Sequence, residues 1–353
     1  QTWTAVSEIS HAHGKKSASD KRKAVAAAVA AAGALAVSNG AIASADLTTN
    51  DAVNVAPNNV PNPTAGREAV AVGANATASH QHSIAIGRNA TAKWTNTVSI
   101  GKDTVASKDH ALAMATSATA LGVQSVGIGS YSNASANSVV SIGQESKAGG
   151  DGSGTAAVAV GYLANASAAN TVAAGKSASA SVDNAVALGV SSQASARNAA
   201  ALGAYSNASG ERAAAVGAVA KASGTASFAG GTSANASGAN SIAIGGSMEE
   251  EGESKAAQAI GKNSIAHGIG TVASQTADIA IGANAAANGT DTPAGSSNGQ
   301  NAGTAISIGA NSVATGIATT ALGEAAKATQ NGAVAVGSKA NATNKAAAAF
   351  GRD

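Results

Sequence analysis

A short phrase recurs at a fixed spacing along most of this sequence. The stretch at 240–245 reads NSIAIG, and close copies read HSIAIG at 82–87, NTVSIG at 96–101 and NAVALG at 184–189. The final glycine steps by 14 from Gly73 to Gly143, with Ala115 in one place, then from Gly161 to Gly245, and again from Gly309 to Gly351. A fixed period of this length is typical of repeat proteins, in which each unit stacks on the next.

The apolar residues inside the phrase alternate with small ones. Ile84 and Ile86 share one face, and the same pattern recurs at Ile242 and Ile244 and at Val334 and Val336. A period of two predicts a β-strand rather than a helix. The glycines that follow, Gly87, Gly245 and Gly337, permit a turn or a close approach of two backbones.

The second half of each repeat alternates more weakly, with Ala at every second place after an Asn, as in NATA at 75–78. Two strands of about five residues and two tight turns would complete one repeat. The sequence therefore predicts an all-β parallel solenoid whose coils stack at about 4.8 Å, giving a rod of about 85 Å.

The composition supports a solenoid rather than an ordinary globular core. Aromatic residues are only 2% of the 353 residues, and the chain contains no cysteine. Since the Val/Ile rows and the Ala rows cannot both line the inside of so thin a coil, we expect one of them to pack against another subunit. The pattern leaves open which row that is.

Between the regular runs the glycine spacing lengthens from 14 to values of 18, 16, 21 and 27. We interpret these places as insertions at 149–154, 246–254, 262–277 and 284–304. Loops on a rigid scaffold commonly carry recognition, so the insertions are candidate binding regions.

Residues 1–45 have the order of a secretory signal peptide. Basic residues at 15–23 precede an apolar run at 24–37, and a small-x-small site ends at Ala45, after which we predict cleavage. The alternative is an Ala-rich helix of the mature domain. Residues 46–66 hold three of the four prolines and are predicted to be an extended linker before a head at 67–353.

The NSIAIG phrase, its regular step and the NASG-type half that follows resemble the head repeat of the trimeric autotransporter adhesins. This YadA-like head is a left-handed parallel β-roll that forms a homotrimer, and residues 1–45 resemble the extended signal peptide region of the same family. The resemblance implies a Gram-negative outer-membrane protein, exposed at the cell surface, that binds collagen, fibronectin, laminin or other cells. The sequence lacks the family's neck, heptad stalk and C-terminal barrel strands, so we expect an N-terminal part whose membrane anchor lies in a C-terminal part not included here.

Two places in the head are candidate ligand-binding sites. The resemblance points to the NSIAIG phrase, in which we expect Ile242 and Ile244 to pack inside and the outward half, Asn240, Ser241 and Ala243, to be available for contact. Asn240 could equally serve only as a turn residue. The loop that follows carries Glu249, Glu250, Glu251 and Glu253, which could hold cations or a basic partner, or could be a solvated charge run.

Other chemistry is weakly indicated. His80 and His82 have metal-ligand spacing on a strand, but no third ligand is near in sequence, so an exposed pair is favoured unless a trimer axis gathers them. The GGDGSG at 149–154 occurs once and does not make a calcium repeat. A formal net charge of +2 gives no reason to expect nucleic acid as a partner.

The sequence therefore favours a non-enzymatic adhesin head with no cofactor and no metal site. The main alternative is an inert spacer that presents another adhesive region. A solenoid acyltransferase would step by six residues, whereas this chain steps by 14.

Overall fold

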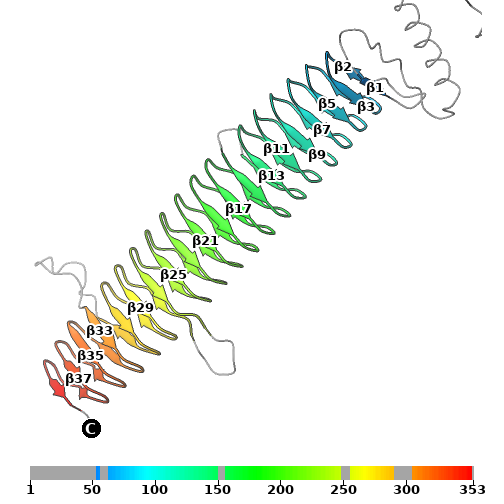
Figure 1. Ribbon diagram of the computed structural model, residues 1–353. Helices are drawn as coiled ribbons and strands as arrows, with labels where there is room; N and C mark the ends of the chain where they lie inside the picture. Colours follow the sequence, from blue (N-terminus) through cyan, green and yellow to red (C-terminus); the bar gives the residue numbers. More distant parts are fainter. Residues whose placement is uncertain (1–52, 56–62, 150–155, 248–254, 290–303, 352–353) are drawn as a thin grey trace, which may run out of the picture.

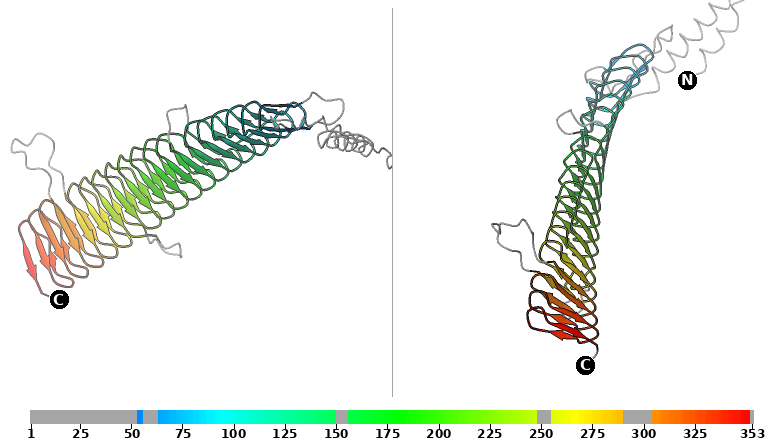
Figure 2. Two further views of the ribbon diagram at one scale, coloured as in Figure 1. Left: turned by 45° about the horizontal axis from the view of Figure 1, so that its top comes forward. Right: turned by 90° about the vertical axis from the view of Figure 1, so that its left-hand side faces the viewer.

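A computed structural model describes residues 53–55, 63–149, 156–247, 255–289 and 304–351 of the chain. These residues form one long stack of short strands (Figure 1), which Figure 2 shows from two further sides. The described residues contain no helix, and hence none with the length and apolar character needed to cross a bilayer. The predicted all-β parallel solenoid is confirmed.

The first strand of each coil belongs to one continuous sheet of 20 strands, which we call sheet A. Its strands are β1 (Val53–Val55), β3 (Val70–Val72), β5 (Ile84–Ile86), β7 (Val98–Ile100), β9 (Leu112–Met114), β11 (Val126–Ile128), β13 (Val140–Ile142), β15 (Val158–Val160), β17 (Val172–Ala174), β19 (Val186–Leu188), β21 (Ala200–Leu202), β23 (Ala214–Val216), β25 (Phe228–Gly230), β27 (Ile242–Ile244), β29 (Ile265–His267), β31 (Ile279–Ile281), β33 (Ala305–Ile308), β35 (Thr319–Leu322), β37 (Val334–Val336) and β39 (Ala348–Phe350).

The second strand of each coil belongs to the facing sheet, which we call sheet B. Its strands are β2 (Thr64–Ala65), β4 (Thr77–Ala78), β6 (Thr91–Ala92), β8 (Val105–Ala106), β10 (Thr119–Ala120), β12 (Asn133–Ala134), β14 (Lys147–Ala148), β16 (Asn165–Ala166), β18 (Ser179–Ala180), β20 (Gln193–Ala194), β22 (Asn207–Ala208), β24 (Lys221–Ala222), β26 (Asn235–Ala236), β28 (Gln258–Ala259), β30 (Val272–Ala273), β32 (Ala286–Asn288), β34 (Val313–Thr315), β36 (Lys327–Ala328) and β38 (Asn341–Ala342).

Every strand pairs in parallel with the equivalent strand of the next coil. In sheet A, Leu188 is the partner of Leu202, and in sheet B, Gln193 is the partner of Asn207, each one coil further along the chain. Most strands contain three residues in sheet A and two in sheet B, not the five predicted. They are short because every half-coil must also contain a turn.

The space between the sheets is filled mainly by alanine, with Ser and Thr at some of the buried positions. Ala187 of β19 and Ala194 of β20 are both fully buried, and the largest fully buried side chain in the described residues is Val139. So narrow an interior has no room for pairs of Ile. The prediction that Ile242 and Ile244 pack inside is therefore wrong, because both point outward and are 37% and 38% exposed.

Two turns close each coil and form the two long edges of the solenoid. We call the edge formed by turns after sheet A strands the first edge, and that formed by turns after sheet B strands the second edge. The first-edge turns begin with the glycine of the phrase, for example Gly189 at φ 132°. A Cβ there would lie 2.6 Å from the backbone carbonyl of Gly203 in the next coil, so the repeated glycine is required by close stacking of the backbones.

Three of the four predicted insertions coincide with longer steps between paired strands, and one does not. Ile242 pairs with Ile265, which is a longer step than the regular one, whereas Ile265 pairs with Ile279 at the regular step of 14. The predicted insertion at 262–277 is therefore wrong, since these residues form a regular coil. His267 stands where the phrase normally has Ile or Val, so the phrase is hard to recognise in this coil. The repeat glycine of the coil is Gly268, whereas Gly261, which the spacing suggests, lies on the second edge.

The predicted linker also contains part of the solenoid. Strands β1 and β2 lie within 46–66, and they pair in parallel with β3 and β4 of the following coil. They therefore make one more coil before the predicted start of the head. Val53 and Val55 supply the alternation there, although the proline-rich surroundings obscure it.

Candidate adhesive surfaces

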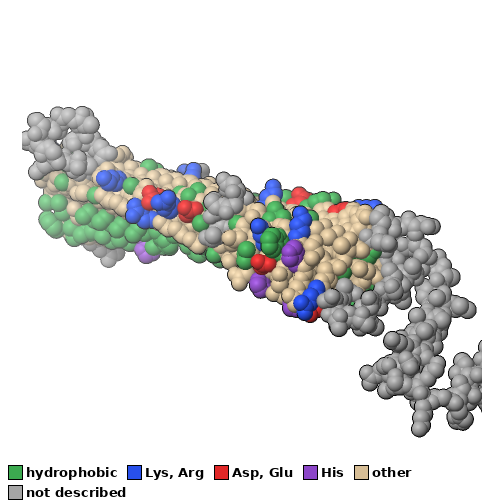
Figure 3. Space-filling model, turned by 90° about the horizontal axis from the view of Figure 1, so that it is seen from above, with side chains coloured by type: hydrophobic (Ala, Val, Ile, Leu, Met, Phe, Trp, Pro, Cys, Tyr) green, Lys and Arg blue, Asp and Glu red, His purple; other side chains and the backbone are tan. Residues whose placement is uncertain are grey.

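The outer face of sheet A is apolar along the whole described length of the solenoid. Two side chains of most strands point outward, and along β1 to β39 they are Val, Ile, Leu, Met, Phe or Ala, apart from Thr320, His267 and Gly230. Figure 3 shows part of this surface as a band of hydrophobic side chains over the C-terminal coils. A continuous apolar stripe of this length on a single chain indicates a surface that another molecule covers.

The outer face of sheet B is polar by contrast. Its outward positions are mainly Thr, Asn, Lys, Gln and Ser, as at Thr119, Asn133 and Lys147. Both sheets bury alanine, so the polarity of the outer residues alone distinguishes the two faces. Sheet B therefore has the character of a surface that stays in water.

Asn240 is a turn residue on the second edge, as the alternative interpretation of the sequence allowed. Its φ is 56°, and its Nδ2 donates a hydrogen bond to Oδ1 of Asn263, 3.0 Å away in the next coil. An equivalent ladder on the first edge links Asn75 to Asn89 at 3.1 Å. Asn tolerates the left-handed backbone, and its amide ties one coil to the next. Asn240 remains exposed, and its role in ligand binding stays a prediction.

Ser241 and Ala243 do not face outward. Both are fully buried between the sheets, on the opposite side of the strand from Ile242 and Ile244. A ligand could not reach either residue without opening the coil, so the expectation that they are available for contact is wrong. The outward half of the NSIAIG phrase consists of its two Ile side chains.

Several other predicted features lie outside the described residues. They are Glu249, Glu250, Glu251 and Glu253 of the acidic loop, the cleavage position Ala45, the segment 150–155 and the segment 290–303. Their roles stay predictions.

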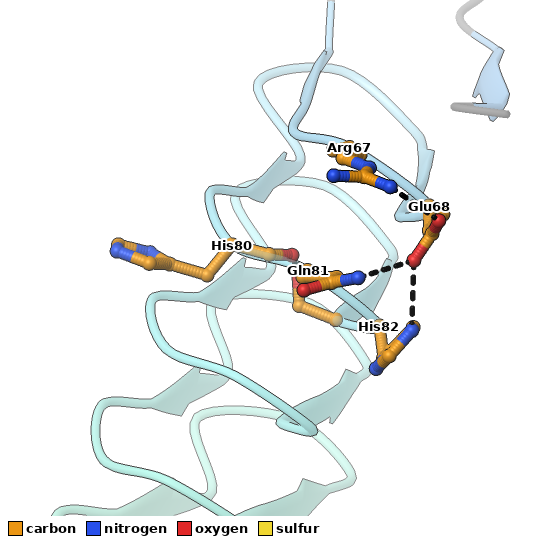
Figure 4. Close-up of polar contacts among 6 residues, drawn as sticks. Arg67, Glu68, His80, Gln81 and His82 are labelled. Atoms are coloured by element: carbon orange, nitrogen blue, oxygen red, sulfur yellow. Dashed lines mark hydrogen bonds and ion pairs between the residues drawn. The ribbon is translucent and has the colours of Figure 1, made fainter. Parts of the chain in front are cut away.

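His80 and His82 lie on the second edge, and their rings point in opposite directions (Figure 4). His82 Nε2 lies 2.8 Å from Oε2 of Glu68, to which the Gln81 amide also donates, and Arg67 lies 3.4 Å from the other oxygen. The Gln81 hydrogen bond, with smaller effects of Arg67 and His82, lowers the pKa of Glu68 below its ordinary value of 4.5.

The His80 ring stacks on Trp94 of the next coil, with ring centroids 5.2 Å apart, and the Lys108 ammonium lies 5.5 Å from the centroid of the same indole ring. Trp94 thus has partners in both the preceding and the following coil. The two histidines do not share a metal ion in one chain, and the described residues contain no group of three or more His, Asp or Glu suited to one.

Two features escaped the sequence interpretation. Asp278 is fully buried, and its carboxylate accepts hydrogen bonds from the backbone N–H groups of Gln275, Gly289 and Ala305. It therefore holds together the two described segments that flank residues 290–303, within the predicted insertion at 284–304. The sequence signal is an acid at the position that precedes the sheet A strand, where the other described coils have Ser, Thr, Ala or, once, Val139.

The second missed feature is a shallow depression of about 380 Å³ lined by Tyr131, Glu145, Lys147 and Leu163. Tyr131, Glu145 and Leu163 occupy the same position in the first-edge turns of three successive coils. The register of the coils brings these residues together, and no local sequence motif predicts the depression.

Comparison with known families gives one match. A profile described as the YadA head domain repeat matches residues 65–90, 120–146, 153–178, 180–206, 208–234, 222–247, 259–285, 301–323 and 314–340. Together these segments cover more than half of the chain and fall on the stacked coils. A search among curated proteins finds no match.

Proposed function

The chain belongs to the YadA head domain family, whose members are cell-surface adhesins, and from this premise we propose that it is the head of a trimeric, non-enzymatic adhesin. The head attaches a Gram-negative cell to host matrix proteins such as collagen, fibronectin or laminin, or to other cells. Residues 1–45 direct its secretion.

The observation that carries this proposal is the apolar outer face of sheet A. Three copies packed with these faces toward a common axis would bury both outward rows, and burial contributes roughly 25 cal/mol for each Å² removed from water. Leu188 and Leu202, stacked in adjacent coils, are typical of the residues that such an axis would bury.

Sheet B and the exposed parts of the turns are then the surfaces left for partners. Most coils present a similar polar surface, and a trimer would present it three times over. Many weak contacts made at once give an avidity far above that of any single contact, so adhesion does not require one deep site.

The first experiment is binding of the purified chain to immobilised collagen, fibronectin and laminin, with albumin as the control surface. We expect concentration-dependent binding to at least one matrix protein. Absence of binding at chain concentrations high enough to coat the surface of a binding partner would favour the inert spacer. Sedimentation equilibrium provides the independent check of the trimer, and a monomer would contradict the buried face.

A further inference from the structure

The first edge of the solenoid carries an unusual row of exposed aromatic and aliphatic side chains between Tyr131 and Val219. All three tyrosines of the chain, Tyr131, Tyr162 and Tyr205, lie on it, with Leu163, Val190 and Val219 beside them. Tyr131 and Tyr205 are 60% and 62% exposed, more than the Ile side chains on sheet A. The row is therefore a surface feature of its own, separate from the outer face of sheet A.

Successive turns hold this row in register through backbone hydrogen bonds. The N–H of Tyr205 donates to the carbonyl of Val190 at 2.8 Å, and the N–H of Val219 donates to the carbonyl of Ala204 at 2.8 Å. Tyr131 and Val219 are six coils apart, or about 29 Å at about 4.8 Å per coil. Five of the seven first-edge turns in this span carry a Tyr, Leu or Val, and the turns that contain Glu145 and Ser177 do not. The apolar side chains thus stand at multiples of one coil spacing on a rigid scaffold.

The backbone conformation disfavours these side chains. Tyr131, Leu163, Tyr205 and Val219 have φ between 56° and 60°, in the left-handed region that suits Gly and Asn and that is a true outlier for bulky or β-branched residues. Other coils place favoured residues there, such as Asn89 and Asn311. Bulky residues kept at strained positions indicate a use for their side chains.

The second edge is the internal comparison. Its turns have the same left-handed position, filled by Gln124, Asn198, Arg212 and their equivalents, and among the described residues none there is Tyr, Leu or Val. The left-handed backbone conformation at this turn position therefore does not require bulky side chains. At this position the two edges differ in what they present to solvent, although other positions of the second-edge turns also expose apolar side chains, as at Trp94 and Val123.

We propose that the first edge from Tyr131 to Val219 binds an extended, apolar-rich polypeptide segment of the adhesion partner. This inference rests on the proposed adhesin function and names the surface and the ligand class. Exposed tyrosines are enriched at protein contacts because each ring supplies a large, stiff, amphipathic surface. About nine residues of extended chain would cover the row.

The chemistry of the row favours a polypeptide over a polysaccharide or a polyanion. Leu163, Val190 and Val219 offer no hydrogen bonds to sugar hydroxyls but can bury apolar side chains. The charged residues in these first-edge turns, Glu145 and Lys176, have opposite signs, so the turns carry no net charge that would attract an anionic polymer.

The test compares Tyr131→Asn/Tyr205→Asn with the matched control Gln124→Asn/Arg212→Asn, which changes the same backbone position on the other edge. The probes are arrays of short overlapping peptides from collagen, fibronectin and laminin, and an array of glycosaminoglycans and other glycans. We expect the edge variant to lose at least tenfold in peptide binding with no lower thermal midpoint, since Asn suits the left-handed turn, and the control to bind as the wild type does.

Three results would overturn this inference: equal peptide binding by the edge variant, wild-type binding only to glycans or to nothing on the arrays, or loss of the trimer in the edge variant. The last would make the edge a subunit contact. If the wild type binds whole matrix proteins and the edge variant binds them equally well, the proposed binding role of the first edge is wrong, whereas the proposed adhesin function is supported. If the wild type binds no matrix protein, the proposed function itself fails.

Discussion

Ala187 in sheet A and Ala194 in sheet B are both buried between the sheets, yet the outward residues beside them, Leu188 and Gln193, differ completely in polarity. These four residues belong to one coil, and the same contrast holds in most of the described coils, with exceptions where sheet B carries an outward Val, as at Val105 and Val272. The interior holds each chain together through small side chains, whereas the exterior decides which face meets another molecule. Stability of the coil and assembly of the chains should therefore respond to different substitutions.

The largest effect should come from reversing the polarity of the apolar face. Leu188→Asp would place three carboxylates in the buried core of the proposed trimer, at a desolvation cost of roughly several kcal/mol per ion. Because Leu188 is 39% exposed in the single chain, the coil itself should tolerate the change. We expect sedimentation equilibrium to show monomers with the strand content of the wild type by circular dichroism.

The matched control is Gln193→Asp, which adds the same charge on the other sheet of the same coil. Gln193 is exposed and should remain in water after assembly, so we expect a trimer whose stability changes by less than about 0.5 kcal/mol. If both variants remain trimeric, or both dissociate, the two faces are not different in the way proposed.

This contrast marks the limit of what the sequence could predict. The regular period and the alternation at Ile84 and Ile86 were enough to predict parallel strands and two turns per coil. Alternation alone shows which residues share a face, but it does not show which face points inward. Side-chain volume decides that question, because sheets this close can accommodate Ala243 between them but not Ile242 or Ile244.

The sites were harder to predict than the fold because they depend on neighbours in other coils. Tyr131 and Leu163 are separated by an insertion that breaks the period, and only the register of the turns brings them to one depression. Asp278 receives its backbone donors from both ends of an insertion. His267 stands in place of an apolar residue of the phrase, so the sequence pattern of that coil resembles an insertion.

A second prediction tests whether the two sheets truly share one interior. Ala187→Leu and Ala194→Leu each force a larger side chain into the same narrow space, and overpacking typically costs about 1–3 kcal/mol. We expect similar losses in the free energy of unfolding, measured by chemical denaturation in the monomeric Leu188→Asp background. Val186→Leu on the outer face should cost less than about 0.5 kcal/mol there. A large difference between the two Ala variants would mean that one sheet supports the coil alone.

A third and more local effect concerns Asp278, the one buried carboxylate among the described residues. Asp278→Ala would leave three backbone N–H groups without their carboxylate partner, and an unsatisfied buried donor costs about 1–3 kcal/mol. Ser264→Ala, at the equivalent position one coil earlier, removes only a hydroxyl that donates to the Gly261 carbonyl. We expect hydrogen exchange at Gly289 and Ala305 to quicken in the Asp278 variant alone. Equal protection in both variants would show that the insertion closes without the acid.

The smallest effect should come from the second edge, where the contacts of Glu68 with Arg67, Gln81 and His82 are exposed to solvent. The pKa of Glu68 is lowered in the folded chain, chiefly by the Gln81 hydrogen bond, so the folded state favours the carboxylate form. Its contribution to stability is therefore present above the unfolded pKa of about 4.5 and is lost as the pH falls through the folded pKa. We expect Gln81→Ala to reduce this slight acid sensitivity of the first coils, measured by hydrogen exchange at Val70 against pH. A sensitivity unchanged by Gln81→Ala would assign the acid response to other carboxylates.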